Sequence, residues 1–271
     1  PLIFNEQNLD AIVLEKLNMT HSPADLTRWR RAVESIRSAD KVIRIGIVGK
    51  YIHLHDSYKS IHEALFHAGV ENGAVVRLVK IDSEPLEHGE TDQLVNIDAM
   101  LIPGGFGHRG IEGMIVAARY ARENDIPCFG ICLGLQVMVI EYARSVLGIR
   151  DADSSEFSPE AAHAVVSLLE EQVDVKVYGG TMRLGRGETL VTEGSIINEA
   201  YKSSSIYERH RHRYEVSNDY RKSLEEADLI IAGVTPDGEL VEAIQWPKHP
   251  WGVGVQFHPE FQSTLIDPHP L

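Results

Sequence analysis

From residue 41 onward, short runs of apolar residues alternate with longer segments whose apolar residues recur every three or four positions. The short runs predict buried strands, and the longer segments predict amphipathic helices. Because the strands are apolar on both faces, they indicate a parallel sheet covered by helices on both sides. The predicted strands span 41–48, 74–81, 97–103 and 126–131, and the predicted helices span 57–69, 111–124 and 133–148. Gly69 is expected to end the first of these helices.

The pattern changes after Asp151, where shorter strands are separated by turn residues. We expect these strands to form an antiparallel extension of the same sheet, so that the chain from 41 to 271 is one α/β domain. The predicted strands lie in GGTMRLG (179–185), ETLVTEG (188–194), HRHRYEVS (210–217), DLIIAGVT (228–235), ELVEAIQW (239–246) and VGVQFHP (253–259).

The first forty residues differ from the rest of the chain. The segment 21–39 predicts one amphipathic helix, with Ser22 as its N-cap and Pro23 at its first position. Its apolar stripe consists of Leu26, Trp29, Val33 and Ile36. We interpret residues 1–40 as a linker helix segment that precedes the domain proper.

Charge and composition narrow the class of protein. The 271 residues carry a formal net charge of −14, which argues against a nucleic-acid partner because no basic surplus is present. Two cysteines and no disulfide framework fit a reducing, cytoplasmic location. No apolar run approaches the roughly 20 residues that a membrane span requires, so no membrane association is expected.

The segment FGICLGLQ (129–136) places Cys132 between Gly130 and Gly134, at the junction of a predicted strand and a predicted helix. This is the G-x-nucleophile-x-G layout of a nucleophile elbow, in which a tight turn exposes the nucleophile at the sheet edge. A helix N-terminus also favours a thiolate. The alternative is a buried core cysteine, which is the more frequent role of the residue. The paired glycines favour a catalytic Cys132, and Cys128, which lacks them, is expected in the core.

A thiol nucleophile requires a general base, and VQFHPEF (255–261) supplies a candidate. His258 and Glu260 lie two positions apart after an apolar strand, so in an extended chain they would share one face at about 6–7 Å. Pro259 between them would stiffen the pair. The alternative is a solvated His-Pro-Glu turn.

Three further motifs resemble nucleotide or metal sites but do not meet the requirements of such sites, although a glycine-rich loop can still present backbone N–H groups to an anion. The run from Gly105 to Gly110 matches G-x-G-x-x-G, but Cys132 occupies the region where a dinucleotide site requires an acidic residue. Gly46-Ile-Val-Gly49-Lys50 lacks the spacing and the hydroxyl residue of a phosphate-binding P-loop. His53, His55 and Asp56 form HLHD, which we interpret as a loop and not as a metal site.

The motifs PGGFG (103–107), GICLGLQ (130–136) and FHPEF (257–261) resemble, in this order, those of the class I glutamine amidotransferases. Further stretches are similar to the glutaminase domains of the CTP synthase family: GKY (49–51), DSY (56–58), GGFGHRG (104–110), SSEF (154–157), GGTMRLG (179–185), ERHRHRYEV (208–216) and HPWGVGVQFHPEF (249–261). The resemblance runs from about Val42 to the last residue. It implies the class I amidotransferase fold, with a central mostly parallel sheet, flanking helices, an antiparallel extension and a nucleophile elbow.

Carried over to this chain, the resemblance implies a catalytic triad of Cys132 as nucleophile, His258 as general base and acid, and Glu260 as the residue that orients the imidazole. It assigns the glutamine amide to Gly105, Phe106, Leu133, Gly134, Leu135 and Gln136. The amino-acid end would be held by Glu156 and Arg213, which suits a ligand with one ammonium and one carboxylate. The alternative for Arg213 is an exposed strand of alternating basic residues.

The resemblance implies L-glutamine as substrate and no cofactor for the glutaminase reaction. In the family, the ammonia passes to a synthase domain that aminates UTP with ATP and magnesium, with GTP as activator, in an enzyme that is a homo-oligomer when full length. No phosphate-transfer motif precedes residue 41, so the synthase domain is expected to be absent from this chain. The alternatives are another class I amidotransferase, a γ-glutamyl peptidase, or a regulatory module without turnover, against which the intact triad argues.

Overall fold

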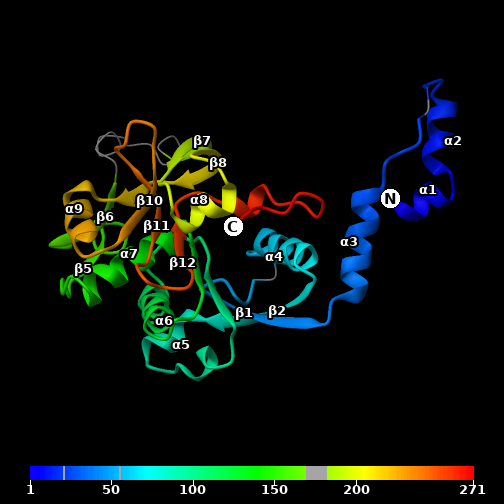
Figure 1. The fold of residues 1–271 in the computed structure, drawn as a ribbon. Coiled ribbons are helices and arrows are strands. Elements are labelled where there is room, and N and C mark those ends of the chain that lie inside the picture. The colour runs from blue at the N-terminus through cyan, green and yellow to red at the C-terminus, as the bar shows by residue number, and fades with distance from the viewer. Residues whose placement is uncertain (21, 55, 169–181) are drawn as a thin grey trace.

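A nine-stranded sheet forms the centre of the molecule in the computed structural model, which describes residues 1–20, 22–54, 56–168 and 182–271 (Figure 1). The strand order is β2-β1-β3-β4-β12-β11-β10-β7-β8. The strands are β1 (Lys41–Gly49), β2 (Ala74–Asp82), β3 (Ala99–Ile102), β4 (Cys128–Ile131), β7 (Arg183–Val191), β8 (Ser205–His212), β10 (Ile230–Val234), β11 (Val241–Gln245) and β12 (Gly252–Val255).

The sheet has a parallel half and an antiparallel half, which confirms the predicted fold class. β2, β1, β3, β4 and β12 are parallel, and β11, β10, β7 and β8 alternate in direction. The prediction was wrong for β12, which was expected in the antiparallel extension. β12 pairs antiparallel with β11 on one side and parallel with β4 on the other, because the extension returns the chain to the central slot beside β4.

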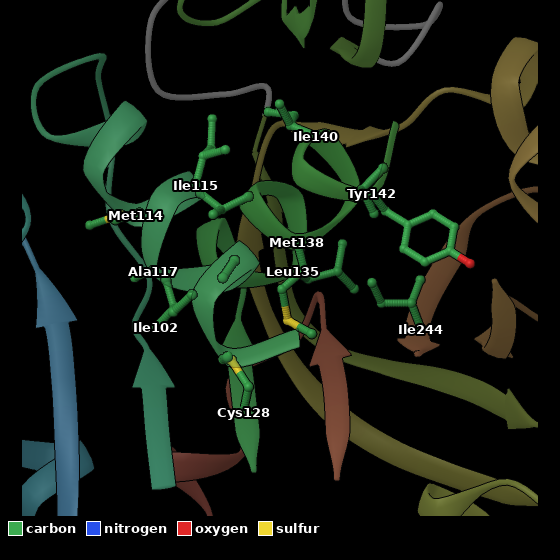
Figure 2. Close-up of a cluster of buried hydrophobic side chains, with 14 of the residues drawn as sticks. Ile102, Met114, Ile115, Ala117, Cys128, Leu135, Met138, Ile140, Tyr142 and Ile244 are labelled. Carbon is green, nitrogen blue, oxygen red and sulfur yellow. The ribbon is translucent and has the colours of Figure 1, made fainter. Parts of the chain in front are cut away.

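Helices cover both faces of the sheet, and the alternating side chains of β3 show how. Met100 and Ile102 contribute to the core under α6 (Ile111–Glu123) and α7 (Leu133–Ser145), beside which α5 (Ser83–Glu87) packs. Figure 2 shows this core, with Leu135 and Met138 of α7 near Cys128 of the sheet. Leu101 belongs to the opposite core, with α4 (Lys59–Glu71) and α8 (Ile196–Tyr201). The central strands β3, β4 and β12 are therefore buried on both faces, as their apolar sequences predicted.

A second, three-stranded sheet was not predicted. It consists of β5 (Ala152–Ser154), β6 (His163–Leu168) and β9 (Tyr214–Val216), and α9 (Asn218–Glu226) follows it. The segment predicted as one strand at 210–217 is divided at Arg213 between β8 of the large sheet and β9 of the small one. Residues 179–181 of the predicted GGTMRLG strand lie outside the described residues, and β7 begins at Arg183.

The amino-terminal segment forms three helices, α1 (Leu2–Glu6), α2 (Leu9–Lys16) and α3 (Thr27–Ser38), where one was predicted. The predicted start at Ser22 and Pro23 was wrong. The helix begins at Thr27 with Leu26 as its N-cap, and the Asp25 carboxylate just before it accepts a hydrogen bond from the Thr27 N–H at 2.9 Å. Figure 1 shows these helices at one end of the molecule, beyond α4 and β2.

Two contacts attach α3 to α4. The Ser35 hydroxyl donates to the Val70 carbonyl, and Arg31 pairs with Glu71 at 3.1 Å. α4 itself extends to Glu71, past the Gly69 at which it was predicted to end. A Cβ at Gly69 would lie 2.7 Å from the carbonyl oxygen of Ala74, so this glycine permits close packing of helix on strand and is not a cap. Within the described part of the chain, no helix is both long and apolar enough to span a membrane.

The approach of α7 to the sheet yields a stability prediction. A Cβ on Gly134 would lie 2.1 Å from the main-chain oxygen of Ile102, which cannot move without disturbing β3. Gly134→Ala should therefore reduce the free energy of unfolding by about 3 kcal/mol. Gly73→Ala is the control, because Gly73 has a positive φ but no neighbouring atom within 4 Å, and its cost should be about 1 kcal/mol. Urea unfolding measures both, and equal losses would contradict the packing argument.

Candidate active site

The backbone at Cys132 has the strained conformation of a nucleophile elbow. Cys132 lies between β4 and α7 with φ 54° and ψ −102°, a conformation that non-glycine residues rarely adopt. The flanking glycines are required sterically, because a Cβ at Gly130 would lie 2.6 Å from the main-chain carbon of Gly134. The predicted elbow is confirmed by this geometry.

Cys132 is held from several sides. Its N–H donates to the Val255 carbonyl at 2.7 Å, and the Gln256 side-chain amide lies 3.7 Å from its Sγ. The residue is only 3% exposed, yet it lines two cavities. Cys128 packs in the core under α7, as expected, and burial raises the pKa of its thiol. Of the two thiols, Cys132 therefore has the position that a ligand can reach.

His258 and Glu260 are paired, but not in the predicted way. The predicted extended chain was wrong, because Pro259 begins a 3-10 turn, η3 (Pro259–Phe261). The turn brings the His258 Nδ1 to 2.8 Å from the Glu260 Oε1, much closer than an extended chain allows. The imidazole and Cys132 lie next to each other, because a Cβ added at Gly104 would be 3.0 Å from the His258 Cε1 and 3.5 Å from the Cys132 Cβ, and both residues line one cavity. Cys132, His258 and Glu260 thus form one connected array.

The electrostatics of this array favour a charged imidazole. Burial opposes the charge of His258, but the hydrogen bonds and negative charges of Cys132 and Glu260 outweigh it and raise the pKa of His258 to about 10. An imidazolium beside the sulfur stabilises a thiolate.

A cavity of about 330 Å³ opens beside Cys132, a volume at the small end for ligand sites. It is lined by Gly105, Phe106, Cys132, Gln136, Glu156, Met182, His212, Arg213 and Tyr214. Glu156 accepts a hydrogen bond from the Gly107 N–H at 2.7 Å, and its burial raises its pKa against the opposing charges of Lys50 and Arg213. The cavity therefore contains a carboxylate and a guanidinium that interact electrostatically.

The helix residues of the predicted site occupy different places. The Gln136 side chain lies in the cavity and donates to the Tyr214 carbonyl at 2.9 Å. Leu135 is fully buried in the core, so only its main chain is available to a ligand. Leu133 lies at the start of α7 against Gly105, where a Cβ would meet its Cδ2 at 3.1 Å.

Three lining residues were not predicted: Met182, His212 and Tyr214. His212 belongs to β8, in which the histidines point inward and Arg209 and Arg211 point to solvent. The period-two alternation of RHRHR (209–213) was a signal for this arrangement. The Nε2 of His212 lies 2.5 Å from the Glu215 Oε1, and both side chains are buried. Arg213 follows β8 and faces the cavity, in contrast to the exposed alternating arginines.

A second cavity, of about 470 Å³, is lined by both Cys132 and His258. Its lining includes Gly104, Phe106 and Arg211 besides these two residues. Of the HLHD loop, His53 lies 3.1 Å from Asp82, and His55 lies outside the described residues. No group of three or more potential metal ligands occurs in the portion of the chain that the structure describes.

The array generates a titration prediction. In the wild-type chain the His258 imidazole should remain protonated to about pH 9, and in Cys132→Ala its pKa should fall, because the hydrogen bond and charge of the sulfur are lost. Since the folded pKa is raised, the pair stabilises the fold fully below about pH 6.5 and loses this contribution as pH rises through 10. Histidine NMR titration, with His258→Gln for assignment, measures the shift. A wild-type midpoint near 6.5 would contradict the pairing.

Comparison with known proteins places the chain in a family. The model of the family "Glutamine amidotransferase class-I" matches residues 53–271. The CTP synthases of Carboxydothermus hydrogenoformans and Geobacter sulfurreducens are each 50% identical to this chain. Each match covers 100% of this chain and 51% of the relative. The chain thus spans about half the length of these relatives.

A solved structure supports the same grouping. The glutaminase domain of Trypanosoma brucei CTPS, with bound acivicin, is 40% identical and superposes with a TM-score of 0.79 over 84% of this chain and 90% of that one. The nucleophile elbow, the paired imidazole and carboxylate, and the sheet order described above accompany this match in sequence and fold. The chain therefore belongs to the class I glutamine amidotransferase family.

Proposed function

We propose that this chain hydrolyses L-glutamine to glutamate and ammonia through a thioester on Cys132. The observation that carries the proposal is the array of Cys132, His258 and Glu260 beside a cavity that contains one half-buried carboxylate and one guanidinium. Glutamine has a matching ammonium and carboxylate, and its side-chain amide is the bond that a thiolate can attack. The fold alone would not support this choice, because one fold carries many functions.

The reaction proceeds in two stages. The Cys132 thiolate attacks the side-chain carbonyl carbon of glutamine, forming a C–S bond and a tetrahedral oxyanion. His258 donates its proton to the leaving nitrogen, the C–N bond breaks, and ammonia departs from a thioester. The neutral imidazole then takes a proton from water, whose oxygen displaces the sulfur to give glutamate. Glu260 holds the ring through Nδ1 in both stages.

Substrate recognition is assigned to the cavity residues. Glu156 would hold the α-ammonium of glutamine, and Arg213 would hold its α-carboxylate. The N–H groups of Gly105 or Phe106 and of Leu133 would stabilise the oxyanion, and Gly134, Leu135 and Gln136 would shape the amide end. The closeness of Gly105 and Leu133 supports this assignment, since a Cβ added at Gly105 would lie 3.1 Å from the Leu133 Cδ2.

Within the full-length protein, we propose that the ammonia aminates UTP to CTP. The support is the similarity to CTP synthases, of which this chain covers half. ATP and magnesium, with GTP as activator, are then ligands of the full-length protein, which is proposed to be a homo-oligomer. No step of the glutaminase reaction uses them.

Residues 1–40 are proposed to be the linker to that part, with the amidotransferase domain at 41–271. Several large apolar side chains of α1 and α2, among them Ile3, Phe4, Ile12 and Val13, are exposed. In a monomeric domain such a set usually marks a contact surface. A cytoplasmic location is proposed from the composition, which includes only two cysteines.

The nucleophile assignment is tested by ammonia release from glutamine, measured on this chain and on the full-length protein. Cys132→Ala should lower the rate at least about 10,000-fold, because the covalent route is lost. Cys128→Ala is the matched control and should retain activity, since its thiol lies in the core. If neither the wild-type chain nor the full-length protein released ammonia, the proposed function would be refuted. If Cys132→Ala remained active, the assignment of Cys132 as nucleophile would be refuted.

The recognition assignment predicts a binding defect. Arg213→Ala should raise the KM for glutamine roughly 10- to 100-fold and change kcat less, because a charged hydrogen bond to the carboxylate is lost. Arg186→Ala is the control, since that guanidinium stacks on Tyr207 at 4.3 Å and does not line the cavity. Steady-state kinetics distinguish the two, and an unchanged KM in Arg213→Ala would remove Arg213 from the substrate site.

A further inference from the structure

A buried lysine lies behind the glycine-rich loop that borders Cys132. Lys50 follows the last residue of β1 and is only 3% exposed, although lysines are rarely buried without a partner. Its ammonium does not lie within ion-pair distance of a carboxylate in the described residues. It donates instead to two main-chain carbonyls of the loop, those of Phe106, at 3.1 Å, and Gly107.

These contacts clamp one peptide plane at both ends. The Phe106 carbonyl also accepts from the Tyr51 hydroxyl at 3.2 Å. The N–H of the same peptide belongs to Gly107, and it donates to Glu156 at 2.7 Å. Because the peptide unit is planar, with its C=O and N–H pointing in opposite directions, the three partners fix its orientation.

The clamped peptide adjoins the candidate oxyanion donors. Phe106 has its own N–H in the preceding peptide, so a fixed 106–107 plane limits how the Gly105–Phe106 peptide can turn. The stem of Lys50 lies beside that peptide, since a Cβ added at Gly105 would be 3.4 Å from the lysine Cε. Neighbouring Gly104 lies close to the reacting pair, because a Cβ added there would be 3.0 Å from the His258 Cε1 and 3.5 Å from the Cys132 Cβ.

Lys50 is itself held rigidly. The Arg109 guanidinium donates to the Lys50 carbonyl at 2.6 Å and pairs with Glu84. Burial lowers the pKa of Lys50 to about 8, with an opposing effect of the Glu156 charge and a smaller lowering by Arg109. The ammonium is thus retained at neutral pH at a site where burial disfavours it. An apolar residue would fill this position without that cost, but it would leave both loop carbonyls without their donor.

We infer that Lys50 is a positioning residue for the hydrolysis of glutamine, whose ammonium fixes the 106–107 peptide and thereby aims the N–H groups of Gly105 and Phe106 at the oxyanion. The inference rests on the proposed function. Lys50 touches no reacting atom. It acts through the loop, whose donors must be oriented before the tetrahedral state forms if they are to stabilise it.

The experiment replaces the ammonium and keeps the stem. Lys50→Met in the full chain should lower kcat for ammonia release roughly 10- to 100-fold, as a misplaced donor does, with a smaller change in KM. The rate at which iodoacetamide alkylates Cys132 should stay within about threefold of wild type, because this displacement forms no oxyanion at a carbonyl. Lys222→Met, which changes a largely exposed lysine on α9, is the matched control and should leave both rates unaltered.

The outcomes separate a positioning role from a general structural one. An unchanged kcat in Lys50→Met would overturn the inference, as would a parallel loss of kcat and alkylation rate, or a rise of KM alone. If Lys50→Met does not fold, Tyr51→Phe removes the other donor to the Phe106 carbonyl, and it should lower kcat without changing alkylation. Wild-type protein without ammonia release overturns the proposed function and this inference together. An active wild type with an unaffected Lys50→Met and Tyr51→Phe overturns only the inference.

Discussion

The site depends on one close contact, that of the first turn of α7 with the end of β3. Gly134 lies so near the Ile102 carbonyl that no Cβ fits between them. Cys132, two residues before Gly134, has a positive φ that only a well-packed surrounding maintains. α7 supplies the packing, because its residues from Leu133 to Ala143 are buried. The packing of α7 in the larger core therefore maintains the strained backbone conformation that places Cys132 at the two cavities.

The order of strands converts this contact into a catalytic array. β3, β4 and β12 are adjacent and parallel, so the residues that follow them meet at one edge of the sheet. The glycine loop at 104–107 follows β3, Cys132 follows β4, and His258 comes three residues after β12. The antiparallel extension matters for this reason, since it carries the chain away from β4 and returns it beside β4. A Cys132 N–H bonded to Val255 joins the two strands at the point of chemistry.

The sequence predicted those features of the site that depend on residues close to one another in the chain. The elbow was readable because Gly130 and Gly134 must flank the nucleophile, and the parallel half was readable because its strands are apolar throughout. The pairing of His258 with Glu260 was predicted from spacing, but its geometry was not, since a 3-10 turn at Pro259 replaced the extended chain. The small sheet was missed because two of its strands have three residues each and β6 pairs with β9 about fifty positions away. Its contacts, more than any propensity of its residues, determine it.

The role of Lys50 could not be predicted from the sequence, and the reason is the chemical nature of its hydrogen-bond partners. In the sequence, Lys50 ends a stretch that lacks the spacing of a phosphate-binding P-loop. No pattern of neighbouring residue types indicates a catalytic role for it. Its partners are main-chain carbonyls of Phe106 and Gly107, and every residue has such a group, so no side-chain type can announce them. A catalytic cysteine, by contrast, requires particular residue types around it. Residues that act on side chains leave a pattern in the sequence, whereas those that orient the main chain become visible only when the fold brings distant segments together.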